Sequence, residues 1–107
     1  MGEKGDKLTN SSVLATELLL EKLSPVTGIS SKKMFGGHGI FHDGKMFGMV
    51  DSKGRCFLKT NDSNKHDYEE LGAEKHSRMP YYLIPDAIIN DNDKLLVWAQ
   101  KSIDITK

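Results

Sequence analysis

The sequence predicts an α+β domain of two layers, in which an antiparallel β-meander sheet packs against N-terminal and C-terminal helices. Two observations lead to this fold class. Apolar residues recur at helical spacing near both ends of the 107-residue chain. Between them, over residues 32–60, the period changes to two and glycine-containing turns interrupt it. Helices that are segregated around a run of hairpins are typical of α+β folds and not of parallel α/β folds.

The first helix is expected to follow residues 9–12, Thr-Asn-Ser-Ser, whose side-chain oxygens can cap its amino end. Pro25 and Gly28 end it, because proline cannot continue a helix and glycine suits the left-handed exit. Residues 1–8 lack an apolar run and are expected to form a flexible tail before a single domain over residues 9–107. The apolar side of the helix comprises Leu14, Ala15, Leu18, Leu19 and Leu23, with Glu17 and Glu21 on the other side.

Two turn signals divide the central strands. Asp43-Gly44 is typical of a two-residue hairpin turn, because both central residues of that turn need positive φ. Ser52-Lys53-Gly54 suits a three-residue loop closed by a glycine bulge. The resulting register pairs His42 with Lys45, Ile40 with Phe47, His38 with Met49, Met49 with Phe57, and Phe47 with Lys59.

This register gives the sheet two faces. One is nearly uncharged and is expected to form the main core under the helices; it comprises Gly39, Phe41, Met46, Gly48, Val50, Cys56 and Leu58. The other has an aromatic and methionine centre edged with cations; it comprises His38, Ile40, His42, Lys45, Phe47, Met49, Arg55, Phe57 and Lys59. A slip of one residue at either turn would redistribute the residues between the faces.

The second half of the chain predicts a short helix, a strand and a last helix. Residues 61–64, Asn-Asp-Ser-Asn, cap the short helix and Gly72 ends it. Residues 80–84 have the pattern of a strand, Pro85 begins a helical turn, and the last helix starts at Asn92 or Asp93. The apolar residues expected to anchor these helices are Tyr68 and Leu71 in the short one, and Leu95, Leu96, Ala99 and Ile103 in the last, flanked by Trp98.

Composition sets limits on partners and location. The chain has 15 basic and 15 acidic residues, so no global field favours nucleic acid or an anionic membrane. No apolar stretch approaches the roughly 20 residues that span a bilayer, and no membrane partner is expected. Cys56 is the single cysteine, so no internal disulfide can form, and a reducing compartment, the cytoplasm, is expected.

The spacing Gly39-x4-Gly44-Lys45 matches the start of a phosphate-binding loop. Such a loop needs a serine or threonine after the lysine and a helix beyond it. Met46 occupies that position, and a strand pattern follows. The stretch is therefore predicted to be a hairpin turn, and no cofactor is expected.

Other catalytic chemistries find no support in the residue pattern. His38 and His42 would share a strand face, but at about 3.3 Å per residue they stand roughly 13 Å apart, too far to bind one metal ion. Cys56 falls inside a predicted strand, where a small buried hydrophobe is the usual occupant. No catalytic, cofactor-binding or metal-binding residue is predicted, and the protein is expected not to be an enzyme.

Charge is unevenly distributed along the chain. Residues 32–59 hold six basic side chains against two acidic ones, whereas residues 61–74 hold five acidic side chains against one lysine. Two solvated faces would account for this pattern. A dipolar surface of this kind can also orient a macromolecular partner.

Several short motifs together resemble one known family. They are Lys33-Met34-Phe35-Gly36-Gly37-His38-Gly39-Ile40-Phe41, Asp43-Gly44-Lys45-Met46-Phe47, Leu58-Lys59, Gly72-Ala73, Tyr81-Tyr82 with Pro85, and Leu95-Leu96-x-Trp98-Ala99. In this order, across roughly residues 8–105, they resemble the N-terminal domain of TfoX/Sxy proteins, bacterial regulators associated with natural DNA transformation competence. The resemblance implies an antiparallel sheet flanked by helices and a regulatory role without catalysis. Full-length competence regulators look to have a second, helical C-terminal domain, so a stand-alone form is expected here.

We therefore expect a small regulatory module that acts through protein contacts, with a homodimer compatible with the pattern. The alternative is single-stranded or duplex nucleic-acid binding, in which rings on the cation-edged face stack on bases and cations hold phosphates. A core whose long basic side chains reach outward at its edge accounts for the same pattern. The candidate interaction residues are Lys32, Lys33, His38, Lys45, Phe47, Arg55, Phe57 and Lys59.

Overall fold

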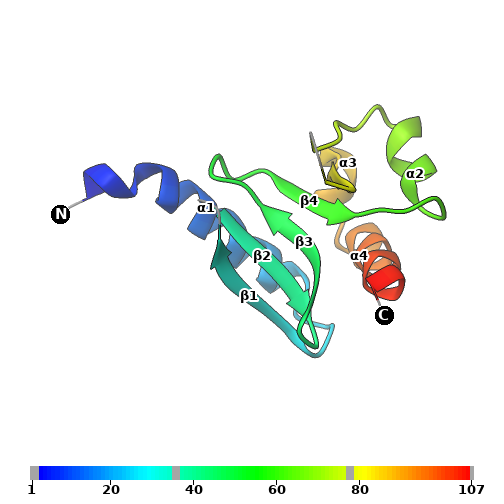
Figure 1. Ribbon diagram of the computed structural model, residues 1–107, viewed down its shortest axis with the longest axis horizontal. Coiled ribbons are helices and arrows are strands. Elements are labelled where there is room, and N and C mark those ends of the chain that lie inside the picture. The colour runs from blue at the N-terminus through cyan, green and yellow to red at the C-terminus, as the bar shows by residue number, and fades with distance from the viewer. Residues whose placement is uncertain (1–2, 35–36, 77–78, 107) are drawn as a thin grey trace.

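The computed structural model describes the backbone of residues 3–34, 37–76 and 79–106, and the side chains of those residues from Ser12 onward except Met34. Over these residues the chain forms one five-stranded antiparallel sheet and four helices (Figure 1). The predicted α+β class is confirmed. The strands are β1 (Ile29–Met34), β2 (Gly37–His42), β3 (Lys45–Val50), β4 (Cys56–Lys59) and β5 (Tyr81–Leu83), and the helices are α1 (Glu3–Lys22), α2 (Lys65–Glu70), α3 (Asp86–Ile89) and α4 (Asn92–Thr106).

The strands lie in the sheet in chain order, from β1 at one edge to β5. The predicted meander is therefore confirmed. The β2–β3 hairpin turns at Asp43 and Gly44, whose φ angles of 50° and 85° are both positive, as a two-residue hairpin requires. Gly54, with φ 84°, closes the β3–β4 loop through a hydrogen bond from its amide to the carbonyl of Asp51 at 3.0 Å.

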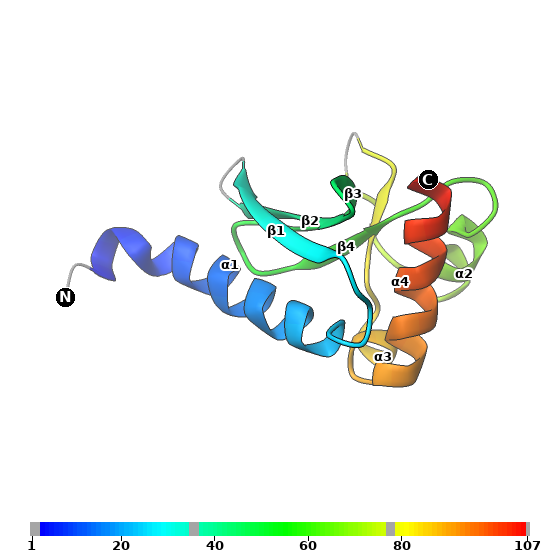
Figure 2. The same cartoon turned by 90° about the horizontal axis from the view of Figure 1, so that it is seen from below.

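The helices α1 and α4 pack on the same face of the sheet (Figure 2). Between them and the sheet lies a core of side chains that are at most 1% exposed, among them Leu19 and Leu23 of α1, Ile40, Val50 and Leu58 of the strands, and Leu95, Ala99 and Ile103 of α4. The predicted stripe of the last helix is confirmed, with Leu96 and Trp98 half-buried against this core. The opposite face of the sheet carries no helix over the described residues, and Figure 1 looks onto it.

The start and the rotation of α1 differ from the prediction. The helix begins at Glu3, so the cap expected at residues 9–12 is wrong and residues 3–8, expected to form a tail, are helical. The side of α1 toward the sheet is formed by Ser12, Thr16, Leu19 and Leu23. Because two of these side chains are small, this side can approach the strands closely. Leu14 and Leu18, which were expected to be buried, are 53% and 56% exposed.

A β-bulge in β3 changes the predicted register. Ile40 pairs with Gly48, and Phe41 pairs with Met46, so Phe47 is an extra residue on β3. The predicted pairs Ile40–Phe47 and His38–Met49 are wrong, whereas His42–Lys45 and Met49–Phe57 are confirmed. Phe47 enters the core beside Gly48, which has no side chain to compete with it. Past the bulge, Phe41 and Met46 therefore lie on the face without helices, not in the core as expected.

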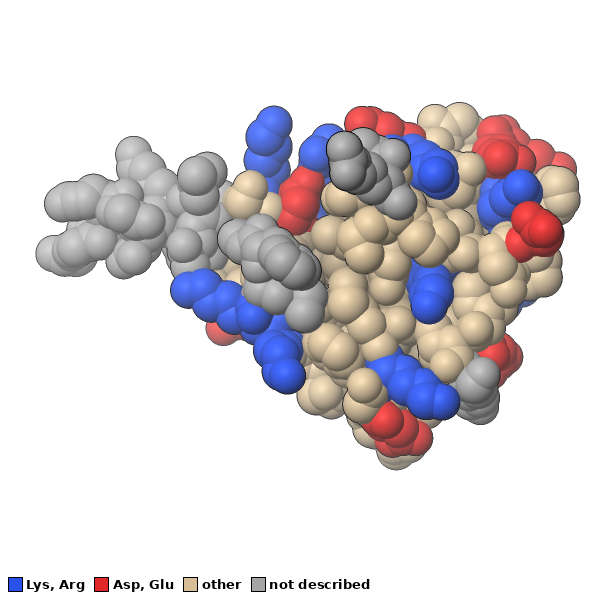
Figure 3. Space-filling view, viewed as in Figure 1, with Lys and Arg blue, Asp and Glu red and all other residues tan. Residues whose placement is uncertain are grey.

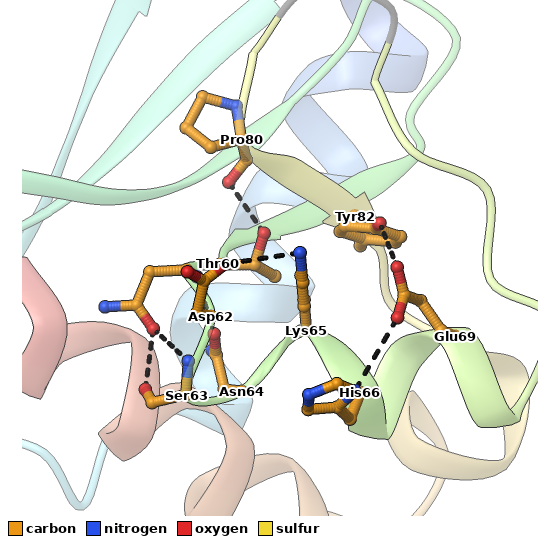
Figure 4. A network of polar contacts seen from close by, with 10 residues as sticks. Thr60, Asp62, Ser63, Asn64, Lys65, His66, Glu69, Pro80 and Tyr82 are labelled. Carbon is orange, nitrogen blue, oxygen red and sulfur yellow. Dashed lines mark hydrogen bonds and ion pairs between the residues drawn. The ribbon is translucent and has the colours of Figure 1, made fainter.

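Polar contacts hold α2 and the loop before it against the sheet (Figure 4). Thr60 Oγ1 donates a hydrogen bond to the carbonyl of Pro80 at 3.1 Å, and the Tyr82 hydroxyl donates to Glu69 Oε2 at 3.1 Å. Asn64 lies at the predicted cap position of α2, but its side chain donates to the last carbonyl of β4 at 3.2 Å instead of capping the helix. Tyr68 of α2 is buried, as expected, and Leu71 is exposed, contrary to expectation.

Candidate interaction surface

The side of the sheet away from α1 and α4, called here the open face, is rich in apolar side chains. Strand pairing places together on it Gly39 with Met49, Phe41 with Met46, Phe57 with Leu83, and Lys59 with Tyr81. Phe41, Met46, Met49 and Leu83 are only half-buried. Figure 3 shows this side of the molecule as a broad area of uncharged residues with separate lysine and arginine side chains around and within it.

Among the described residues, Lys32, Lys59 and Arg55 lie on or beside the open face. Lys32 pairs with Gly39 and so projects to this side, where its side chain is exposed. Lys59 is half-buried on β4. The Arg55 guanidinium carbon lies 5.8 Å from the centre of the Phe57 ring, within the range of a cation–π contact. Lys32 and Lys59 would favour an acidic partner over a basic one, whereas the charge of Arg55 is already paired with Asp51 at 2.7 Å and lies 3.9 Å from Glu74.

Asp51 positions Arg55. Its Oδ1 accepts hydrogen bonds from the amides of Lys53 at 3.0 Å and Arg55 at 2.8 Å, and its Oδ2 accepts one from Arg55 Nε at 2.7 Å. Burial acts to raise the pKa of Asp51, but the hydrogen bonds and positive charge of Arg55 outweigh it and the pKa is lowered. The guanidinium, whose side chain is 44% exposed, is therefore held over the sheet by the loop that follows β3.

The eight candidate residues do not form one surface. Lys32, Arg55, Phe57 and Lys59 belong to the open face, whereas Lys33 pairs with His38 on the side of α1. Lys45 is exposed next to the β2–β3 turn. Phe47 is fully buried among the core residues, so it is not part of any surface.

The two phenylalanines expected to stack on bases are not accessible. Phe47 is 0% exposed and Phe57 is 2% exposed, the latter covered by Arg55 and by the edge-on ring of His76 at 5.5 Å. A stacking platform built from these two rings is therefore wrong. Met49 was expected on the cation-edged face, whereas Phe41, Met46 and Leu83 were missed. A glycine within a strand pattern is a known sign of a bulge, so Phe47-Gly48 was the signal that could have placed Phe41 and Met46.

His38 contacts α1 and not a partner. Its Nδ1 lies 2.8 Å from Ser12 Oγ, and Ser12 is 0% exposed. A serine beside a histidine is also the arrangement used in nucleophilic catalysis. No substrate can reach a hydroxyl that is enclosed between a helix and a sheet, so in this structure the pair is a structural contact.

A match to a family model over most of the fold identifies the family of this chain. A family model described as the TfoX N-terminal domain matches residues 21–105. The chain belongs to the TfoX N-terminal domain family. The match includes every strand and therefore the whole open face of this TfoX N-terminal domain, whereas most of α1 precedes it. No curated protein shows significant sequence similarity to the chain.

The described residues of this TfoX N-terminal domain offer few groups for other chemistry. Among them, no set of three or more histidine, cysteine, aspartate or glutamate side chains lies close enough together to hold a metal ion. Burial raises the pKa of the Cys56 thiol to about 11, which keeps it protonated. Residues 39–45 form β2, its turn and the start of β3, with no helix to receive a phosphate. No described helix is both long enough and apolar enough to span a membrane.

Proposed function

We propose that this TfoX N-terminal domain is a non-enzymatic regulatory module that binds another protein through its open face. One observation carries the proposal: half-buried apolar side chains cluster on a sheet face over which the described chain places no helix. An antiparallel sheet with a solvated face normally alternates apolar and polar residues, with the polar ones outward. Here Phe41, Met46, Met49 and Leu83 point outward. Apolar clusters of this kind mark interaction sites.

The cations define the kind of partner. Lys32 and Arg55 are exposed beside the apolar cluster, and the hydrogen bonds that Arg55 donates to Asp51 hold Arg55 in place before any partner arrives. A preorganised arginine loses less conformational entropy on binding. An acidic protein surface with apolar side chains at its centre would match both features.

Affinity capture with matched variants tests this function. The chain is immobilised in three forms: unchanged, with K32E and M49Q on the open face, and with K94E and V97Q, an exposed lysine and an exposed apolar residue on α4. We expect the unchanged chain and the α4 variant to retain one and the same partner protein, in a saturable way. The open-face variant should bind that partner about tenfold more weakly, which is the usual effect of removing one residue that dominates the binding energy of an interface. Equal retention by all three forms, or no saturable retention by any, would contradict the proposal.

Nucleic-acid binding is the second candidate function. It is favoured by Phe41, a half-exposed ring that shares the open face with Lys32 and Lys59. Such binding must weaken with salt, because cations that contact phosphates release counterions. Fluorescence anisotropy with single-stranded and duplex oligonucleotides at low salt checks it. A flat titration with both would remove this candidate and leave the protein-binding proposal unaffected.

A further inference from the structure

A second apolar surface lies on α1, separate from the open face. Leu14 and Leu18 are more than half exposed, and Glu17 and Glu21 are exposed beside them. The spacing of these residues, i, i+3, i+4 and i+7, places all four on one side of the helix. They are called here the α1 stripe, and together with Leu20 they line a shallow, mostly apolar hollow.

The α1 stripe faces away from the rest of the molecule. The opposite side of the helix, formed by Ser12, Thr16, Leu19 and Leu23, packs toward the sheet. The amino-terminal part of α1 projects beyond the strands (Figures 1 and 2), and the molecule measures 45 Å along its longest axis against 29 and 25 Å along the others. A second helix could therefore lie along α1 without meeting the sheet.

The charge of the stripe restricts what can cover it. Within the described residues, neither Glu17 nor Glu21 has an ion pair or a side-chain hydrogen bond. A basic partner would bring cations to both carboxylates while its apolar side chains covered Leu14 and Leu18. A second copy of the chain, docked stripe to stripe, would instead bring glutamates close to glutamates, which disfavours that pairing.

We propose that the α1 stripe is a docking site for a basic amphipathic helix of a partner protein. The leucines provide the apolar contact and the glutamates select for lysine or arginine beside it. The site is on the helix layer, on the side of the sheet opposite the open face (Figure 2), so the inference does not depend on the proposed function.

The direct test uses a labelled synthetic peptide of leucine and lysine, patterned as an amphipathic helix of about 18 residues, above the length at which isolated helices are marginal. Two control peptides have the same composition in scrambled order and the same pattern with glutamate in place of lysine. Backbone amide shifts of the full chain are followed during titration. We expect saturable shifts centred on the α1 stripe with the basic helix, and binding at least about tenfold weaker for both controls.

Variants of the chain separate contact from unfolding. L14Q with L18Q, and E17K with E21K, change only exposed positions and keep good helix formers, so circular dichroism should be unchanged. Each pair is expected to weaken peptide binding by at least about tenfold. The controls L71Q with V97Q, two equally exposed apolar residues elsewhere, and E70K on α2 should bind as the unchanged chain does.

Three results would overturn the inference. The first is an affinity for the glutamate peptide equal to that for the lysine peptide, which would show that charge does not select the partner. The second is a set of shifts confined to the open face. The third is self-association, measured by sedimentation, that the L14Q and L18Q pair abolishes, since this would identify a second copy as the occupant of the α1 stripe.

Discussion

Ser12 on α1 and His38 on β2 are joined side chain to side chain, with 2.8 Å between Oγ and Nδ1. The contact links two segments 26 residues apart in sequence, and it lies on the side of α1 that meets the sheet. That orientation places Leu19 and Leu23 in the core and leaves Leu14 and Leu18 outside. Leucines lie on two sides of this helix, and the polar pair lies on the side that packs against the sheet.

Ser12→Ala is expected to destabilise the fold by about 1 kcal/mol. The substitution removes the hydrogen bond and leaves Nδ1 of the half-buried His38 without a hydrogen-bond partner. Urea unfolding measures the loss. Ser24→Ala, at an exposed position after the helix, should change stability by less than about 0.5 kcal/mol. If a double-mutant cycle with His38→Gln shows no coupling, the two side chains do not stabilise each other.

Two glycines of the sheet should differ in their tolerance of alanine. A Cβ at Gly48 would lie 3.1 Å from the carbonyl oxygen of Phe57 and 3.5 Å from Ile40 Cβ, so small shifts can accommodate it. A Cβ at Gly37 would overlap the carbonyl oxygen of Val50, so the backbone of Val50 and Asp51 would have to move. We expect Gly48→Ala to cost about 1 kcal/mol and Gly37→Ala about 3 kcal/mol, as for overpacking. Thermal unfolding that ranks them in the reverse order would contradict this.

Asp51→Asn should lower stability near neutral pH and have little effect in acid. The pKa of Asp51 is lowered in the folded chain, so its carboxylate stabilises the fold above its unfolded value, near 3.8, and this contribution is lost as the pH falls through the folded pKa. Asparagine can still accept the two amide hydrogen bonds, so the loss at neutral pH is about 0.5–1 kcal/mol, limited by the solvent exposure of Arg55.

Urea unfolding of both proteins between about pH 7 and pH 2 tests the Asp51 prediction. The difference in stability should shrink steadily below the unfolded pKa. A difference that stays constant with pH would mean that the carboxylate charge contributes nothing. Asp62→Asn is a suitable control, because the Asp62 side chain is 98% exposed in its ion pair with Lys65.

The Cys56 thiol should react slowly in the folded protein. Burial raises its pKa from 9.0 to about 11, which lowers the thiolate fraction about 100-fold, and only the thiolate is the nucleophile. An aromatic disulfide reagent, followed by absorbance at about pH 8, should react at least about 100-fold more slowly with the native chain than with the chain in guanidinium. Equal rates would show that β4 opens readily.

Local signals allowed much of the fold to be predicted. Asp43-Gly44 and Gly54 require or favour positive φ, and each of these turns lies where the sequence placed it. The buried side of α4 was also predictable, because Leu95, Ala99 and Ile103 recur at helical spacing on one side, and Val97 is the exposed exception among the apolar residues.

The open face was not predicted, because the sequence offers a glycine as a sign of a bulge but contacts distant in sequence decide where the bulge forms. An extra residue in β3 reverses which side chains point outward, and the alternation of apolar residues alone is compatible with either register. The rotation of α1 was missed for a related reason. Leucines occur on both sides of that helix, and the choice between the sides is made by packing against β2. The hydrogen bonds that Arg55 donates to Asp51 have no distinct sequence signal.

The position of β1 at the edge of the sheet has a consequence for aggregation. At the β5 side, Lys75 pairs with Tyr82 and covers that edge, whereas β1 has a paired neighbour only in β2 among the described residues. An uncovered edge strand can template the strand of another molecule. Lys32 and Lys33 point to opposite faces of β1, so a second β1 added there would meet unpaired positive charge on both faces. These adjacent lysines would therefore oppose growth of the sheet into fibres through the β1 edge.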